Sequence, residues 1–152
     1  MSAIDSSFPS HPNAFVHRRL VEFCETDAAG IVHFSALMQY MEQAEHALLR
    51  SIGTTVFSSH PDTVTWPRVH VHADFLSTAS FEDSLLIYVS IQKLGETSIT
   101  YGFEVLGPRG IVAEGISVSV CCVRSADAPH GLRKISIPGE LRDSLARYLQ
   151  RS

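Results

Sequence analysis

Residues 24–50 read CETDAAGIVHFSALMQYMEQAEHALLR, and this stretch decides the fold. Ser35 is a good helix cap and Gly53 is typical of a helix end, so we expect a helix from just after Ser35 to about Ser51. On a helical wheel its apolar side chains cover an arc of roughly 200°, whereas a surface helix needs only about 100°. Other parts of the chain must therefore cover this helix.

The pattern on either side of the helix predicts an antiparallel sheet as that cover. Residues 14–24 partly alternate between apolar and polar side chains, which indicates a strand. Residues 66–75 alternate with a period of two, placing Val69 on one face and Arg68 with His70 on the other. Three further runs are also strand-like, with short links typical of hairpins, and Pro138 opens a short C-terminal helix. These further runs are residues 84–93, 97–106 and 110–123.

The length of 152 residues fits one domain, and the order of one strand, one long helix and four strands makes it an α+β domain. We expect this domain to span residues 14–152, after a flexible extension over residues 1–13. The net charge of −4 and the lack of a Lys/Arg run argue against a nucleic-acid partner. Three cysteines make neither a disulfide framework nor a zinc site, so a reduced, cytoplasmic protein is expected. No run approaches the ~18 apolar residues of a membrane span, and no integral membrane segment is expected.

Two carboxylates on the helix need an explanation. Glu45 falls inside the apolar arc and Glu42 lies at its edge, and a buried carboxylate is costly unless it is paired. The favoured interpretation is a structural pair between Glu45 and a strand His or Arg. The alternative is a second polar group of the active site. On the strand face shared by His70, His72 and Asp74, exposed polar side chains are a commoner arrangement than a metal site, so no metal is expected.

The loop before the helix carries a D-x-x-G pattern at Asp27 and Gly30. Asp and Gly both favour turns, so a purely structural turn is one interpretation. The other is catalytic. A helix N-terminus leaves backbone N–H groups unpaired and partly positive, so it can bind an oxyanion while an upstream carboxylate acts on the acyl carbon.

The segment ETDAAGIVHFSALMQYMEQAEHALLRSIG closely resembles the motif of the 4-hydroxybenzoyl-CoA thioesterase family of hotdog-fold proteins, which includes the acyl-CoA thioesterases associated with the Tol–Pal system. The resemblance implies an antiparallel sheet of about five strands wrapped around one long helix. It also implies two protomers sharing one sheet, hence a homodimer or homotetramer. The matching residues are Asp27, Gly30, Ile31, Val32, His33, Phe34, Tyr40 and Glu42.

The resemblance also implies an activity and a site. Asp27 takes the place of the catalytic nucleophile or general base, and the oxyanion-binding backbone N–H falls on His33 or Phe34, beside Gly30. We therefore expect an acyl-CoA thioester hydrolase with coenzyme A as part of the substrate and no cofactor. Glu45 and Glu42 are candidates for residues that support the site residues from behind, or for part of a site that is shared between two protomers.

Two other functions use the same pocket. A hotdog hydratase or dehydratase would need a His with a carboxylate, such as His33 or His46 with Glu45. The H-F-P-G type of loop that is typical of that class is replaced here by HFSA. A non-catalytic acyl-CoA binding protein is the second alternative, and the presence of Asp27 disfavours it.

Overall fold

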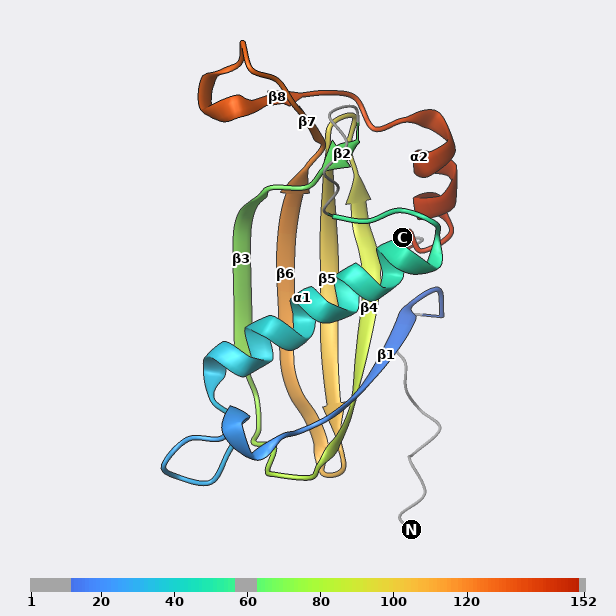
Figure 1. Cartoon of the computed structure of the whole chain (residues 1–152). Helices are drawn as coiled ribbons and strands as arrows, with labels where there is room; N and C mark the ends of the chain where they lie inside the picture. The colour runs from blue at the N-terminus through green and yellow to red at the C-terminus, as the bar shows by residue number, and fades with distance from the viewer. Residues whose placement is uncertain (1–11, 57–62, 151–152) are drawn as a thin grey trace.

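A computed structural model describes residues 12–56 and 63–150, and in it one long helix crosses one face of a five-stranded antiparallel sheet (Figure 1). The sheet order is β1-β4-β5-β6-β3, and the predicted α+β architecture is confirmed. The predicted extension lies outside the described residues except for its last two. The main elements are β1 (Phe15–Leu20), α1 (Phe34–Ser51), β3 (Arg68–Phe75), β4 (Ser84–Leu94), β5 (Ser98–Gly107) and β6 (Gly110–Val120).

Smaller elements lie beyond the ends of the main strands. A three-stranded sheet of order β2-β7-β8 lies at the end of the molecule opposite the start of α1 (Figure 1). A short helix follows Pro138, as predicted, and packs beside β4. These elements are 3-10 helix η1 (Phe23–Glu25), β2 (Val64–Thr65), β7 (Cys122–Arg124), 3-10 helix η2 (Pro129–Gly131), β8 (Leu132–Lys134) and α2 (Gly139–Ala146).

Helix α1 supplies much of the core, as its wide apolar arc predicts. Its buried side chains join those of the central strands in one continuous cluster. Tyr40 and Leu48 are completely buried, and so are Leu85 and Ile87 of β4. The sheet therefore provides the cover that the helix requires. The buried residues of α1 are Ala36, Leu37, Tyr40, Met41, Ala44, Glu45, Leu48 and Leu49.

Two predicted boundaries are wrong. The first strand ends at Leu20, because the chain then turns into η1. Helix α1 begins at Phe34, and its N-cap is His33 rather than Ser35. His33 has extended backbone angles, and its ring nitrogen Nδ1 accepts the Ser35 N–H at 3.2 Å. The predicted end of α1 is confirmed, since Gly53 has a φ of +84°.

The alternation predicted for residues 66–75 breaks at a β-bulge. Arg68 lies opposite Ser119 of β6, but His70 lies opposite Val118, so Val69 is an extra residue in the strand. The bulge places the Arg68 side chain on the face that carries α1, whereas His70 stays on the outer face. The prediction that Arg68 and His70 share a face is therefore wrong.

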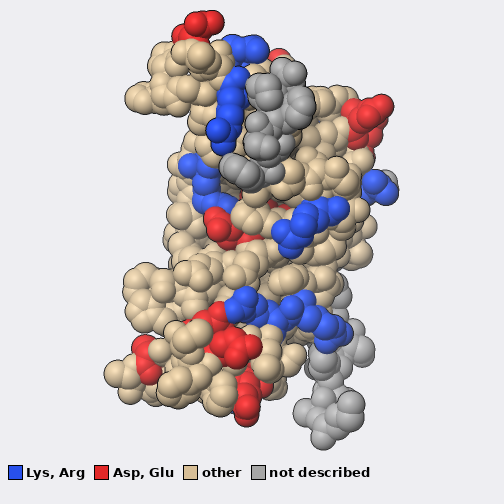
Figure 2. All heavy atoms as spheres, in the orientation of Figure 1, with Lys and Arg blue, Asp and Glu red and all other residues tan. Residues whose placement is uncertain are grey.

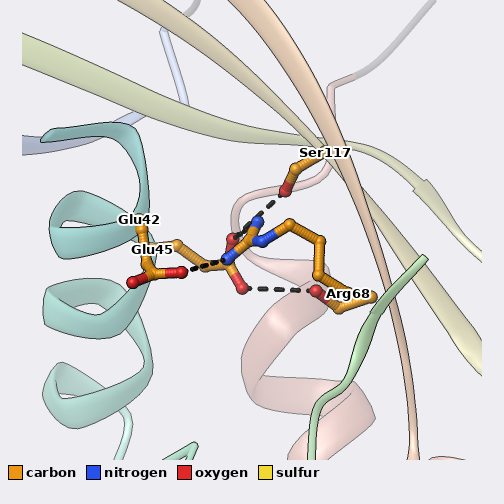
Figure 3. Close-up of polar contacts among 5 residues, drawn as sticks. Glu42, Glu45, Arg68 and Ser117 are labelled. Atoms are coloured by element: carbon orange, nitrogen blue, oxygen red, sulfur yellow. Dashed lines mark hydrogen bonds and ion pairs between the residues drawn. The ribbon is translucent and has the colours of Figure 1, made fainter. Parts of the chain in front are cut away.

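Arg68, which the bulge turns toward the helix, pairs with the buried carboxylate of Glu45 on α1. Arg68 Nη1 lies 2.8 Å from Glu45 Oε2, and the hydroxyls of Ser117 and Ser119 donate to the same carboxylate at 3.1 and 3.4 Å. Arg68 Nη2 also lies 3.3 Å from Glu42 Oε2 (Figure 3). Glu45 is 1% exposed, so the predicted pairing of a buried glutamate with a strand residue is confirmed.

This pairing makes Glu45→Gln destabilising. The amide removes the charge from a buried group that has charged and hydroxyl donors, and we expect a loss of about 1–3 kcal/mol in the free energy of unfolding. Glu42→Gln is the matched control on the same arginine, because Glu42 is 52% exposed and an exposed ion pair contributes about 0–1 kcal/mol. Denaturant unfolding measures both variants. Equal stabilities for the two would contradict the buried pair.

Candidate active site

Asp27 lies in a closed turn between η1 and α1. Its N–H donates to the Ile31 carbonyl at 2.8 Å, and the Gly30 N–H donates to the Asp27 carbonyl at 3.0 Å. Gly30 has a φ of +79°, a conformation that side chains disfavour. Asp27 Oδ1 accepts the Ala29 N–H at 2.8 Å. The turn thus occupies one carboxylate oxygen, while Oδ2 has no hydrogen bond to any described residue.

The N-terminus of α1 has one unused backbone donor. The Ala36 N–H donates to the His33 carbonyl at 2.9 Å, and the Ser35 N–H donates to His33 Nδ1. The His33 N–H is also engaged, because it donates to the Glu25 carbonyl at 2.9 Å. The Phe34 N–H, by contrast, has no acceptor within the described part of the chain. Of the two predicted oxyanion donors, Phe34 is the one that is free to bind a ligand.

Asp27 and Phe34 line the same groove, which has a volume of about 400 Å³. Its other lining residues are Ile31, Val32 and Leu37, and the segment 75–79 forms a second wall beside them. That wall is fixed to the loop, since the Val32 N–H donates to the Ala79 carbonyl at 2.8 Å. The groove is mainly apolar, with a carboxylate and a helix N-terminus at one place.

The remaining predicted residues lie around this groove or away from it. Gly30 shapes the turn, and the His33 ring stacks against Phe34 with centroids 4.5 Å apart. Neither residue lines the groove. Glu45 lies about 16 Å along the helix axis from Phe34, at 1.5 Å per residue, and both Glu45 and Glu42 are held by Arg68. The structure therefore brings Asp27 and Phe34 together and leaves the two glutamates apart.

Residues 12–56 and 63–150 contain neither a metal site nor a membrane-spanning helix. Within these ranges, no group of three or more His, Cys, Asp or Glu is arranged to hold a metal ion. His72 Nε2 and Asp74 Oδ2 lie 3.2 Å apart on the exposed outer face of β3. None of the helices in these ranges has the length and apolar character needed to cross a bilayer.

Charge around the site is mixed rather than of one sign. On the face that carries α1, acidic side chains gather at the end where the Asp27 loop lies, and a row of basic side chains lies beside them (Figure 2). One of the contacts at this end joins Arg19 to Glu25. The surface at this end therefore carries charges of both signs.

Sequence reasoning missed Glu25, two residues before Asp27. Its side chain is 14% exposed, and its Oε2 accepts the hydroxyl proton of Tyr40 at 2.5 Å. Burial raises the pKa of Tyr40, while Arg19 acts in the opposite direction. The signal that was available is Tyr40 itself, because a tyrosine within an apolar helical arc needs a partner for its hydroxyl.

The chain is similar in sequence to known thioester hydrolases. The family model described as Thioesterase superfamily matches residues 29–113. A 1,4-dihydroxy-2-naphthoyl-CoA hydrolase of Synechococcus sp. is 31% identical over 140 residues, covering 88% of this chain and 88% of that protein. A protein of the same name from Nostoc punctiforme is 31% identical over 139 residues, covering 90% of this chain and 87% of that protein.

Solved structures give the same result for the fold. The dynemicin thioesterase is 26% identical and superposes with a TM-score of 0.82, covering 91% of this chain and 99% of that chain. The predicted hotdog fold is thus confirmed. Since the family model matches more than half of the chain and the two hydrolases exceed 30% identity over most of their length, this chain belongs to the Thioesterase superfamily.

Proposed function

We propose that this thioesterase hydrolyses an aryl thioester of coenzyme A to the aromatic acid and free coenzyme A, with Asp27 and the Phe34 N–H as its reacting groups. The observation that carries the proposal is their shared groove, in which a carboxylate oxygen and a backbone N–H both lack partners among the described residues. The relatives named 1,4-dihydroxy-2-naphthoyl-CoA hydrolase support an aromatic acyl group. Phe34, Leu37 and Phe75 offer it apolar walls.

The Phe34 N–H is suited to bind the thioester carbonyl oxygen. It lies at the start of the 18-residue helix α1, where the aligned peptide dipoles produce a partial positive charge. During hydrolysis, negative charge moves onto the carbonyl oxygen as the acyl carbon becomes tetrahedral. A fixed donor at this position stabilises that charge more than it stabilises the neutral substrate, and so accelerates the reaction.

Asp27 Oδ2 supplies the second half of the chemistry. It either adds to the acyl carbon directly or removes a proton from a water molecule that does so. In both routes the C–S bond breaks and the electron pair leaves with sulfur. Net consumption of one water gives the carboxylic acid and the thiol. A thiolate is a better leaving group than an alkoxide, because thiols are much more acidic than alcohols, so the scheme needs no acid, metal or redox cofactor.

We also infer that two copies pair through β3 in the functional enzyme. This strand is at one edge of the sheet, so its outer backbone groups are open to a further strand. Val69, Val71 and Phe75 on this strand are 63%, 43% and 49% exposed, which is unusual for neighbouring apolar side chains. Because Phe75 also lines the groove, a partner at this edge would help to enclose the substrate.

The oligomer would be a homodimer or a homotetramer built from such dimers. Its expected location is the cytoplasm, which is supported by the three free thiols, Cys24, Cys121 and Cys122. Burial raises the pKa of Cys121 to about 11, so this thiol is not a nucleophile near neutral pH. Asp27 thus remains the better candidate for the reacting group.

Asp27→Asn tests the catalytic assignment. The amide oxygen can still accept the Ala29 N–H, so the turn is kept while the base or nucleophile is lost. We expect kcat for 1,4-dihydroxy-2-naphthoyl-CoA or benzoyl-CoA to fall by about 10²–10⁴, measured as release of free thiol. The melting temperature should stay within about 2 °C, because a surface change of this kind moves stability by less than about 0.5 kcal/mol.

Asp143→Asn is the matched control, since Asp143 is an exposed carboxylate on α2, away from both the groove and β3. Its kcat should equal that of the wild type. An Asp27→Asn variant with kcat within a few-fold of wild type would show that Asp27 is only a turn residue. Wild-type protein that binds acyl-CoA but releases no thiol would instead indicate a non-catalytic binding protein.

Val71→Lys tests the inferred dimer. A lysine at this edge should place like charges together across the twofold axis and shift sedimentation from dimer or tetramer to monomer, with a parallel loss of activity. Val16→Lys is the control, because Val16 is 42% exposed on β1, the opposite edge of the sheet. It should remain at least dimeric. A wild-type protein that sediments as a monomer at micromolar concentration would contradict the inference.

A further inference from the structure

The Glu25 carboxylate is held by donors from three parts of the chain. Its Oε1 pairs with Arg19 Nη2 of β1, and its Oε2 accepts the Tyr40 hydroxyl of α1 at 2.5 Å. Oε2 also accepts the Glu22 N–H at 2.9 Å. Charge-assisted bonds of this kind are the stronger class of hydrogen bond in proteins. Glu25 is therefore fixed to the strand and the helix, although it belongs to the connection between them.

The two anchors of Glu25 are themselves rigid. Tyr40 is completely buried in the second turn of α1. The Arg19 guanidinium lies over the Tyr40 ring, 4.5 Å from its centroid, and its Nη1 donates to the Gln43 side chain. Arg19 and Tyr40 thus hold each other as well as Glu25. The position of the carboxylate is set by the packed core rather than by the loop.

Glu25 also holds both ends of the Asp27 turn. Its backbone carbonyl accepts the N–H of His33, the residue directly before the open Phe34 N–H. On the other side, Glu25 is two residues from Asp27, and the bridge between Thr26 and Val32 closes the turn between them. One residue therefore connects the chain segment that carries the carboxylate to the helix end that carries the backbone donor.

We propose that Glu25 is a positioning residue, held by Tyr40 and Arg19, that sets the distance between the Asp27 carboxylate and the Phe34 N–H. The inference rests on the proposed function of these two groups. Hydrolysis needs both groups against one thioester at the same time, and a displacement of about 1 Å can reduce the rate about 10²-fold. Glu25 itself is not among the residues that line the groove. Its loss should therefore lower kcat and leave substrate binding nearly unchanged.

Tyr40→Phe and Glu25→Gln test the proposal by changing the donor and the acceptor of the same hydrogen bond. The first removes only the hydroxyl that anchors Glu25, and the second removes the carboxylate charge. We expect kcat to fall about 10- to 100-fold in each variant, with KM within about threefold of wild type. A residue that acted only on stability would lower the melting temperature and leave the kcat of the folded enzyme unchanged.

Two control variants separate a loss of positioning from a loss of stability. Tyr101→Phe also removes a fully buried tyrosine hydroxyl, but that hydroxyl has no hydrogen-bond partner among the described residues. Glu45→Gln also removes a buried, arginine-paired carboxylate, which α1 carries about three turns away from Phe34. Both should keep kcat within about twofold of wild type, because neither side chain touches the Asp27 turn. A kcat loss in either control equal to that in Glu25→Gln would overturn the proposal.

The Asp27→Asn background gives a sharper test. If Glu25 acts through Asp27, adding Glu25→Gln to Asp27→Asn should lower the residual kcat by less than about threefold, since groups that act as one unit are not additive. Amide hydrogen exchange over residues 26–34 gives a readout without activity. It should be faster in Glu25→Gln and Tyr40→Phe than in wild type, and unchanged in Tyr101→Phe.

The outcomes distinguish this proposal from the proposed function. If Asp27→Asn is inactive while Tyr40→Phe and Glu25→Gln keep wild-type kcat, the positioning role is wrong and the catalytic assignment stands. Unchanged hydrogen exchange over residues 26–34 in both variants would also overturn the positioning role. If Asp27→Asn keeps wild-type kcat, the catalytic assignment is wrong and the positioning role falls with it.

Discussion

The need to cover α1 on most of its circumference is the constraint on which the rest of this structure depends. The side chains of Tyr40, Met41, Leu48 and Leu49 are buried together with those of the central strands. Burial of apolar surface at about 25 cal/mol per Å² favours only arrangements in which the sheet curls over the helix. Once the helix is held in this way, its N-terminus has a fixed place, and the loop that folds over that end can form a site.

Polar contacts add the orientation that apolar burial lacks. The two edge strands of the sheet each contribute one arginine toward the helix, Arg19 from β1 and Arg68 from β3. Arg19 contacts Gln43 of the helix together with Glu25, and Arg68 contacts Glu45. Buried ion pairs contribute less to net stability than to the choice of one arrangement over others. Here α1 has a polar contact with each edge of the sheet, to Arg19 through Gln43 and to Arg68 through Glu45.

The sequence predicts those features that depend on the spacing of apolar residues or on the residue types of a short segment. The apolar arc of α1 predicts a covered helix, the period of two predicts the strands, and the D-x-x-G pattern predicts the turn at Asp27 and Gly30. The resemblance of residues 25–53 to a hotdog family predicts the sheet around the helix. Each of these rests on residues close together in the chain, where spacing alone carries the information.

Features that depend on contacts between residues far apart in the chain could not be predicted from local sequence patterns. A bulge that shifts the phase of β3 reverses the direction of Arg68, and no pattern within residues 66–75 marks it. The choice of Phe34 over His33 as the open donor depends on the Glu25 carbonyl, which reaches His33 only through the closed turn. Glu25 itself looks like an exposed residue of a polar loop until Arg19 and Tyr40 are brought to it. Tertiary contacts decide all three cases.

The division of the groove into two walls has a consequence for its shape. Asp27 and the Phe34 N–H lie on one wall, whereas the other is formed by Phe75 at the end of β3 and by residues 76–79 of the connection between β3 and β4. That connection is tied to its neighbours through backbone groups, including the Leu76 N–H to the Val112 carbonyl and the Val32 N–H to the Ala79 carbonyl. Its side chains can therefore change while the backbone stays in place. Exchange of a few side chains there would change the shape of the groove and leave Asp27 and the Phe34 N–H in place.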